Sequence, residues 1–136
     1  MIKVLIVEDD LMIADNLEDV LIEAGYEVCG IATTVDEAIR LGELHRPDLG
    51  IIDLRLRHGE YGTAAAAALC RRGDLGILYA TGNPDHPMLV GAKGVGCIGK
   101  PYSSGSVVAA LKVVSDRMAN LPVPSALPTG FALLAA

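Results

Sequence analysis

The chain has 136 residues, a formal net charge of −6 and three cysteines. The length suits one domain with its own core, and the acidic balance disfavours a nucleic-acid-binding protein, which normally has a basic face. The cysteines lack disulfide-framework or zinc-site spacing, and no apolar stretch is long enough to span a membrane. Without a signal-peptide pattern at its start, the chain is expected to be cytoplasmic.

Short apolar runs alternate with helical patterns along the chain. Runs rich in Val, Ile and Leu predict strands, and apolar residues spaced three or four positions apart predict helices. The expected strands are 3–7, 26–32, 49–52, 77–80 and 95–98. The expected helices are 11–24, 34–44, 63–72, 85–92 and 103–118. The helix at 85–92 is the weakest of these, because Pro87 and Gly91 interrupt it.

Alternating strands and helices predict a parallel sheet covered on both faces. Five such strands commonly take the order 2-1-3-4-5, with ligands bound at the carboxyl ends of the first and third strands. We therefore expect an α/β doubly wound domain of five parallel strands and five helices over residues 1–119. Residues 120–136 contain three prolines and are expected to form a flexible C-terminal tail. The alternative is that its apolar end, 131–134, docks on the domain or on a partner.

Polar side chains follow four of the predicted strands and are expected at one rim of the sheet. They are Glu8, Asp9, Asp10, Asp53, Thr81 and Lys100. Crowded carboxylates repel one another, so a divalent cation bound by oxygens, Mg2+ in particular, would stabilise them. Asp is a known acceptor of phosphoryl groups, and Thr81 and Lys100 can bind phosphoryl oxygens. The set predicts phosphoryl transfer to Asp53 beside Mg2+. Asp10 is instead expected to cap the helix that it precedes.

In this order and at these spacings, the motifs resemble the receiver domain of two-component response regulators. The resemblance covers about residues 2–118 and rests on Val7-Glu8-Asp9-Asp10, Ile51-Ile52-Asp53, Thr81-Gly82 and Lys100-Pro101. It implies a flavodoxin-like fold. It also implies that the protein is a phosphoacceptor switch and not an enzyme, with at most self-catalysed phosphoryl transfer and autodephosphorylation.

The resemblance implies a role for each matching position. Asp53 is the implied phosphoacceptor, and Thr81 and Lys100 are the implied phosphoryl-sensing residues. The Lys100–Pro101 peptide is expected to be cis, as is usual in the family. The implied Mg2+ ligands are Glu8 (through water), Asp9, Asp53 and the backbone carbonyl of Arg55.

The resemblance also implies partners. A sensor histidine kinase or phosphotransfer protein would supply the phosphoryl group. A downstream protein would bind the face formed by the fourth helix, fifth strand and fifth helix. Because no effector domain follows, we expect a stand-alone bacterial receiver that signals by protein contact, without nucleic acid or membrane. The sequence leaves open whether the chain forms a homodimer.

Two positions depart from the family pattern. Cys97 occupies the switch position, where most receivers have an aromatic residue that turns inward on activation, and Arg57 stands where Pro is common. The missing aromatic keeps open an alternative: a receiver-fold interaction module that works without phosphorylation. An enzyme binding flavin or nucleotide is disfavoured, because no Gly-rich loop follows the first strand. The segment Tyr79-Ala80-Thr81-Gly82-Asn83 also resembles a loop of the FAT GUY receivers, which tend to serve the bacterial general stress response.

Overall fold

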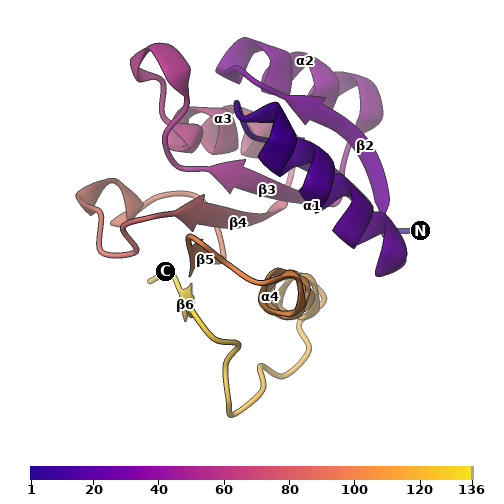
Figure 1. Ribbon diagram of the computed structural model, residues 1–136, viewed down its shortest axis with the longest axis vertical. Coiled ribbons are helices and arrows are strands. Elements are labelled where there is room, and N and C mark those ends of the chain that lie inside the picture. The colour runs from indigo at the N-terminus through magenta and orange to yellow at the C-terminus, as the bar shows by residue number, and fades with distance from the viewer. Residues whose placement is uncertain (136) are drawn as a thin grey trace.

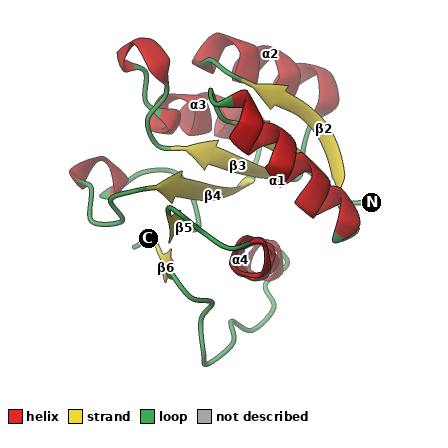
Figure 2. Cartoon of the chain, in the orientation of Figure 1, coloured by secondary structure: helices red, strands yellow, loops and turns green. Residues whose placement is uncertain are grey.

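The computed structural model describes residues 1–135, apart from the side chain of Arg72. One sheet runs through the middle of the molecule, with helices on both sides (Figures 1 and 2). The strands are β1 (Lys3–Val7), β2 (Glu27–Ala32), β3 (Leu49–Asp53), β4 (Gly76–Thr81), β5 (Gly96–Gly99) and β6 (Phe131–Leu133). The α-helices are α1 (Leu11–Glu23), α2 (Val35–His45), α3 (Gly62–Leu69) and α4 (Ser104–Met118). Three short 3-10 helices are η1 (Arg57–Gly59), η2 (Cys70–Arg72) and η3 (Pro87–Leu89).

The sheet has the order β2-β1-β3-β4-β5-β6. The first five strands are parallel, so the expected 2-1-3-4-5 arrangement is confirmed. In the β1–β3 ladder Val7 pairs with Ile52, and in the β3–β4 ladder Asp53 pairs with Ala80. The carboxyl ends of these neighbouring strands therefore lie side by side at one rim of the sheet.

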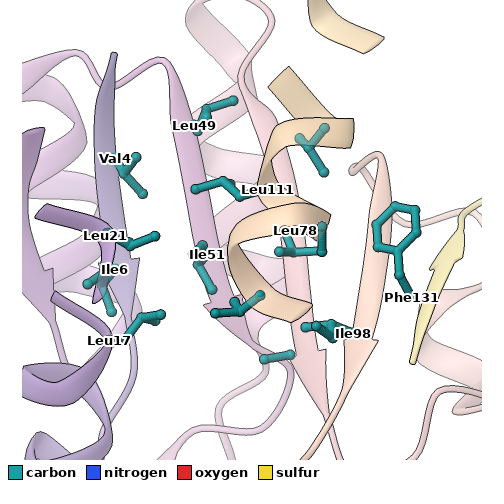
Figure 3. Packing of buried hydrophobic residues seen from close by; sticks show 14 of the residues in the cluster. Val4, Ile6, Leu17, Leu21, Leu49, Ile51, Leu78, Ile98, Leu111 and Phe131 are labelled. Carbon is teal, nitrogen blue, oxygen red and sulfur yellow. The ribbon is translucent and has the colours of Figure 1, made fainter. Parts of the chain in front are cut away.

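Two apolar cores lie on the two faces of the sheet. Helices α1 and α4 pack on one face with Ile6, Ile51 and Leu78 beneath them (Figure 3). Helices α2 and α3 pack on the other face, where the fully buried residues of α3 are small (Gly62, Ala65 and Ala66) and Leu69 packs against the core partly buried. Small residues allow close approach of helix and sheet, because little side-chain volume separates the two backbones. An added Cβ at the first residue of α3 would collide with the carbonyl oxygen of Asp53, so glycine is needed there.

The start of α1 fixes the chain where it leaves β1. The Asp10 side chain accepts hydrogen bonds from the amides of Met12 (3.0 Å) and Ile13 (3.3 Å), which satisfies donors at the helix N-terminus. Asp10 is thus a capping residue, as its position before the helix predicts. Its neighbours Glu8 and Asp9 are left to face the rim of the sheet.

The expected helix at 85–92 does not form, so the domain has four α-helices and not five. Only the single turn η3 occurs between β4 and β5. Pro87 removes a backbone donor, and Gly91 adopts a left-handed φ of 73°, which ends any regular helix. The connection between β4 and β5 is therefore mostly irregular.

Residues 131–133 depart from the expected flexible tail. They form β6, which runs antiparallel to β5 and pairs Phe131 with Ile98. Phe131 is buried because Gly96 has no side chain: an added Cβ there would lie 2.5 Å from the Phe131 ring. Ala136, assigned to the same tail, lies outside the described residues. Across the part of the chain that the structure describes, none of the helices is both long and apolar enough to cross a membrane.

Candidate functional site

Three carboxylates converge at the rim formed by β1 and β3. Glu8 and Asp9 directly follow β1, and Asp53 is the last residue of β3. One oxygen from each lies within 4.8 Å of the others. We call Glu8, Asp9 and Asp53 the acid site. Glu8 is buried, whereas Asp9 and Asp53 are half-buried, so the site is open to solvent on one side.

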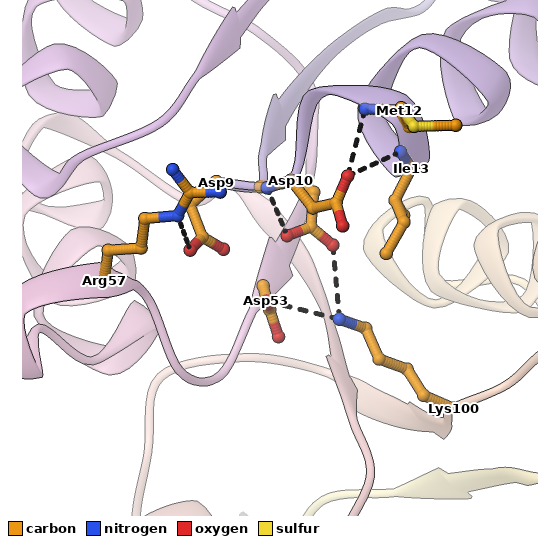
Figure 4. A network of polar contacts seen from close by, with 8 residues as sticks. Asp9, Asp10, Met12, Ile13, Asp53, Arg57 and Lys100 are labelled. Carbon is orange, nitrogen blue, oxygen red and sulfur yellow. Dashed lines mark hydrogen bonds and ion pairs between the residues drawn. The ribbon is translucent and has the colours of Figure 1, made fainter.

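Lys100 neutralises part of this charge. Its Nζ lies 3.2 Å from Glu8 Oε1 and 3.2 Å from Asp53 Oδ2, so one ammonium bridges two carboxylates (Figure 4). The backbone of Lys100 is held to the end of β4, because its amide donates to the Thr81 carbonyl (2.8 Å). The Lys100–Pro101 peptide is cis, as expected. The sequence-predicted neighbourhood of Glu8, Asp53 and Lys100 is therefore present in the fold.

Burial and neighbouring charges shift the pKa values of Glu8 and Lys100. Burial, followed by the negative charge of Asp53, raises the pKa of Glu8 to about 7, although the Asp10 amide and Lys100 act in the opposite direction. Burial alone would lower the pKa of Lys100, but the carboxylates of Asp53 and Glu8 outweigh it and raise that pKa. Lys100 therefore stays protonated, and Glu8 is the acid that titrates near neutral pH.

The donors of the acid site suit a hard divalent cation. All three are carboxylate oxygens, and the cluster contains no sulfur or imidazole ligand. Mg2+ prefers oxygen ligands and uses few protein groups, since it retains several waters. The residues present thus fit Mg2+. A bound cation would also relieve the repulsion that raises the Glu8 pKa.

A model of the response regulator receiver domain matches residues 4–112. The chain belongs to this family. The curated relatives include the transcriptional regulatory protein PdtaR of Mycobacterium tuberculosis, 30% identical over 88% of this chain and 59% of PdtaR. The phyllosphere-induced regulator PhyR of Methylorubrum extorquens is 30% identical over 80% of this chain and 42% of PhyR. The chain thus spans about half the length of these relatives.

Solved receiver structures superpose on the fold as well. The response regulator PhyR from Brucella abortus matches with a TM-score of 0.75 and 26% identity, covering 87% of this chain and 49% of that chain. A solved structure of the PhyR stress response regulator matches with a TM-score of 0.68 and 30% identity, over 80% of this chain and 43% of that one. The receiver family indicated by the sequence motifs is therefore confirmed by the family model, and the doubly wound fold agrees with these solved structures.

The remaining predicted site residues do not belong to the acid site of this receiver domain. Thr81 ends β4, and its buried hydroxyl accepts from the Asn83 amide (3.0 Å) and donates to the Asn83 carbonyl (3.3 Å), not to a carboxylate. Cys97 is buried in the core that also holds Tyr79, and burial raises the pKa of its thiol. Arg55 pairs as an isolated antiparallel bridge with Tyr61, just beyond β3.

One residue of the site was not predicted from the sequence. The Nε of Arg57 lies 3.1 Å from Asp9 Oδ2, on the other side of the acid site from Lys100 (Figure 4). The sequence marks Arg57 only as a departure from the common Pro. The following residues, His58 and Gly59, have left-handed φ angles of 63° and 75° and form a tight turn. The His-Gly pair was the available signal for a turn that folds Arg57 back toward β1.

Proposed function

We propose that this receiver domain accepts a phosphoryl group on Asp53, with Mg2+ bound at the acid site, from a sensor histidine kinase or phosphotransfer protein. The observation that supports this is the convergence of three carboxylates within 4.8 Å beside a lysine 3.2 Å from Asp53. Placing three carboxylates this close together costs free energy, because like charges repel at close range. A bound cation would offset this cost, and such a perturbed cluster is typical of a functional site.

In the proposed reaction, a carboxylate oxygen of Asp53 attacks the phosphorus of a phosphohistidine. The new O–P bond replaces the P–N bond, and the imidazole nitrogen takes the electron pair and a proton. When bound, Mg2+ supplies positive charge that stabilises the transferring phosphoryl oxygens. Lys100 supplies a second positive charge from its fixed position beside Asp53. The domain acts as a switch, with only its own phosphoryl transfer and autodephosphorylation as chemistry.

Thr81 is the proposed sensor of the modified state. Its hydroxyl donates to the Asn83 carbonyl, so donating to a phosphoryl oxygen requires this hydrogen bond to break, which loosens the loop after β4. That loop is irregular apart from η3, which lowers the cost of rearranging it. The added charge on Asp53 would shift the population between two loop conformations.

The proposed output is contact with a downstream cytoplasmic protein. The output face differs from the expected one, since the helix expected at 85–92 is replaced by a loop with one 3-10 turn and β6 covers the edge of β5. The surface available to a partner consists of α4, β6 and the loop between β4 and β5. Similarity to the PhyR stress response regulator, together with the FAT GUY-like loop, favours a partner in bacterial stress signalling.

Thermal unfolding with Mg2+ and beryllofluoride, a phosphoryl mimic, tests the phosphoacceptor. A ligand present at about 100 times its dissociation constant adds about 2.7 kcal/mol to the free energy of unfolding. With Mg2+ and beryllofluoride together, the melting temperature of the wild type should therefore rise by several degrees. Asp53→Asn should lose the response, whereas the exposed control Asp36→Asn should keep it. A rise in Asp53→Asn equal to that of the wild type would refute the assignment.

A second function is a receiver-fold interaction module that works without phosphorylation. The observations that favour it are the Thr81 hydroxyl bonded to the Asn83 backbone and the buried Cys97 in place of the aromatic switch residue. The same experiment separates the two functions. A melting temperature that responds to Mg2+ but not to beryllofluoride would favour the interaction module.

A further inference from the structure

The acid site is contacted by two cations that differ in burial. Lys100 bridges Glu8 and Asp53 with a side chain that is 25% exposed. Arg57 contacts Asp9 at 3.1 Å with a side chain that is 68% exposed. Lys100 thus pairs with Glu8 and Asp53, and Arg57 is the cation that balances the charge of the third carboxylate, Asp9.

The loop that carries Arg57 is a small hairpin, residues 54–61. The Leu56 amide donates to the Glu60 carbonyl (2.9 Å), and Arg55 pairs with Tyr61 below it. Arg57 stands at the tip, where the left-handed residues reverse the chain. A hairpin of this kind limits the directions that its tip residue can take, so the backbone of Arg57 is held at the open side of the acid site.

Contacts on both sides hold this hairpin against the domain. Glu60 Oε1 accepts a hydrogen bond from the Val35 amide at the start of α2 (3.2 Å). On the other side, a guanidinium nitrogen of Arg55 lies 3.1 Å from Nε2 of His86 in the loop after β4. The hairpin is therefore tied to two elements, and the approach of Arg57 to Asp9 follows from the fold and not from a free side chain alone.

We propose that Arg57 competes with the divalent cation for Asp9 and so sets the metal affinity of this receiver domain. This inference rests on the metal site proposed above. A carboxylate oxygen that accepts from a guanidinium is less available to a metal, and a positive side chain beside the site repels a divalent cation. Because Arg57 is mostly exposed, it can leave Asp9 for solvent at small cost. Metal binding is weakened by Arg57 but not prevented.

Calorimetric titration of Mg2+ into the purified full chain tests the proposal. The variants are Arg57→Ala, Arg57→Lys and Arg117→Ala. Arg117 is exposed in the last turn of α4, near Met118, which packs against the first residue of β4 at the opposite end of the sheet. Arg117→Ala therefore removes the same net charge far from the acid site. Melting curves recorded in EDTA would show that each variant is folded.

Arg57→Ala should lower the dissociation constant for Mg2+ by about twofold to fivefold, as expected for loss of an exposed ion pair. Arg57→Lys should remain closer to the wild type, and Arg117→Ala should match it. Raising the salt concentration should shrink the difference, because screening weakens the repulsion. Equal or weaker Mg2+ binding by Arg57→Ala would overturn the proposal for Arg57. Absence of Mg2+ binding in every protein, wild type included, would overturn the metal site itself.

Discussion

Replacing Glu8 by glutamine should stabilise the metal-free protein above neutral pH and change little at acidic pH. Burial and the neighbouring Asp53 raise the pKa of Glu8 from its ordinary value of 4.5 to about 7. Between these two pKa values, the folded protein keeps a proton that the unfolded chain has released. The free energy of unfolding therefore falls as pH rises from about 4.5 to about 7, and the loss is complete above that range. Glutamine has no proton to lose and avoids the penalty.

The magnitude follows from the pKa difference. A change from 4.5 to about 7 corresponds to at most about 3 kcal/mol. The ionised Glu8 keeps its pair with Lys100, which glutamine cannot replace, and the site is open on one side. We therefore expect a net gain of about 1–2 kcal/mol for Glu8→Gln at high pH. For a domain of this size, that gain should raise the melting temperature by about 3–8 °C.

Circular dichroism melts in EDTA at about pH 5 and about pH 8.5 would measure this difference. The control is Glu27→Gln, because Glu27 is exposed at the start of β2 and away from the rim that holds the acid site. The gain for Glu8→Gln should appear at the higher pH only. A Glu8→Gln protein that loses stability with pH as steeply as the wild type would refute the assignment of the titration to Glu8.

Three further substitutions test other parts of the structure. Gly62→Ala places a Cβ against the Asp53 carbonyl and should destabilise the fold by about 1–3 kcal/mol in urea unfolding, and an unchanged midpoint would contradict this packing. Phe131→Ala should release β6 at a cost of at most about 3 kcal/mol, because the segment can detach. Hydrogen exchange of the Gly99 amide, which donates to the Gly130 carbonyl, should then accelerate. An unaltered exchange rate would count against docking of β6 on β5. Lys100→Met should raise the pKa of the Glu8 carboxyl further, which NMR titration would measure. A lower pKa for Glu8 would show that Lys100 does not stabilise the charge of that carboxylate.

The parallel sheet could be predicted because its signals are local. Most core strands are short runs rich in Val, Ile and Leu, and each acid or lysine of the motifs stands at the end of a strand or directly after it. Since parallel strands in this order end at one rim, the positions of Glu8, Asp53 and Lys100 follow from topology alone. The helix expected at 85–92 failed for a local reason as well. Its apolar residues fit a helix, but Pro87 and the left-handed Gly91 outweigh them.

Other features depend on contacts between distant residues, which periodicity does not show. Strand β6 forms because Gly96 in β5 leaves room for Phe131, the only Phe of the chain. The two residues are 35 positions apart in the sequence. Neither residue alone indicates a strand pair. The contact of Arg57 with Asp9 likewise depends on a hairpin whose register is set by the backbone hydrogen bond from the Leu56 amide to the Glu60 carbonyl.

The two cations of the acid site have different physical roles because they differ in attachment. Lys100 is partly buried, bridges two carboxylates, and has its amide bonded to the Thr81 carbonyl, so moving it would leave buried Glu8 without a counter-charge. Arg57 contacts one half-buried carboxylate from solvent, and water can replace it at that carboxylate. On the proposals made above, a cation entering from the open side would therefore displace Arg57 and leave Lys100 in place. The lysine would remain beside Asp53 for the proposed phosphoryl transfer, while the arginine would adjust how readily the metal binds.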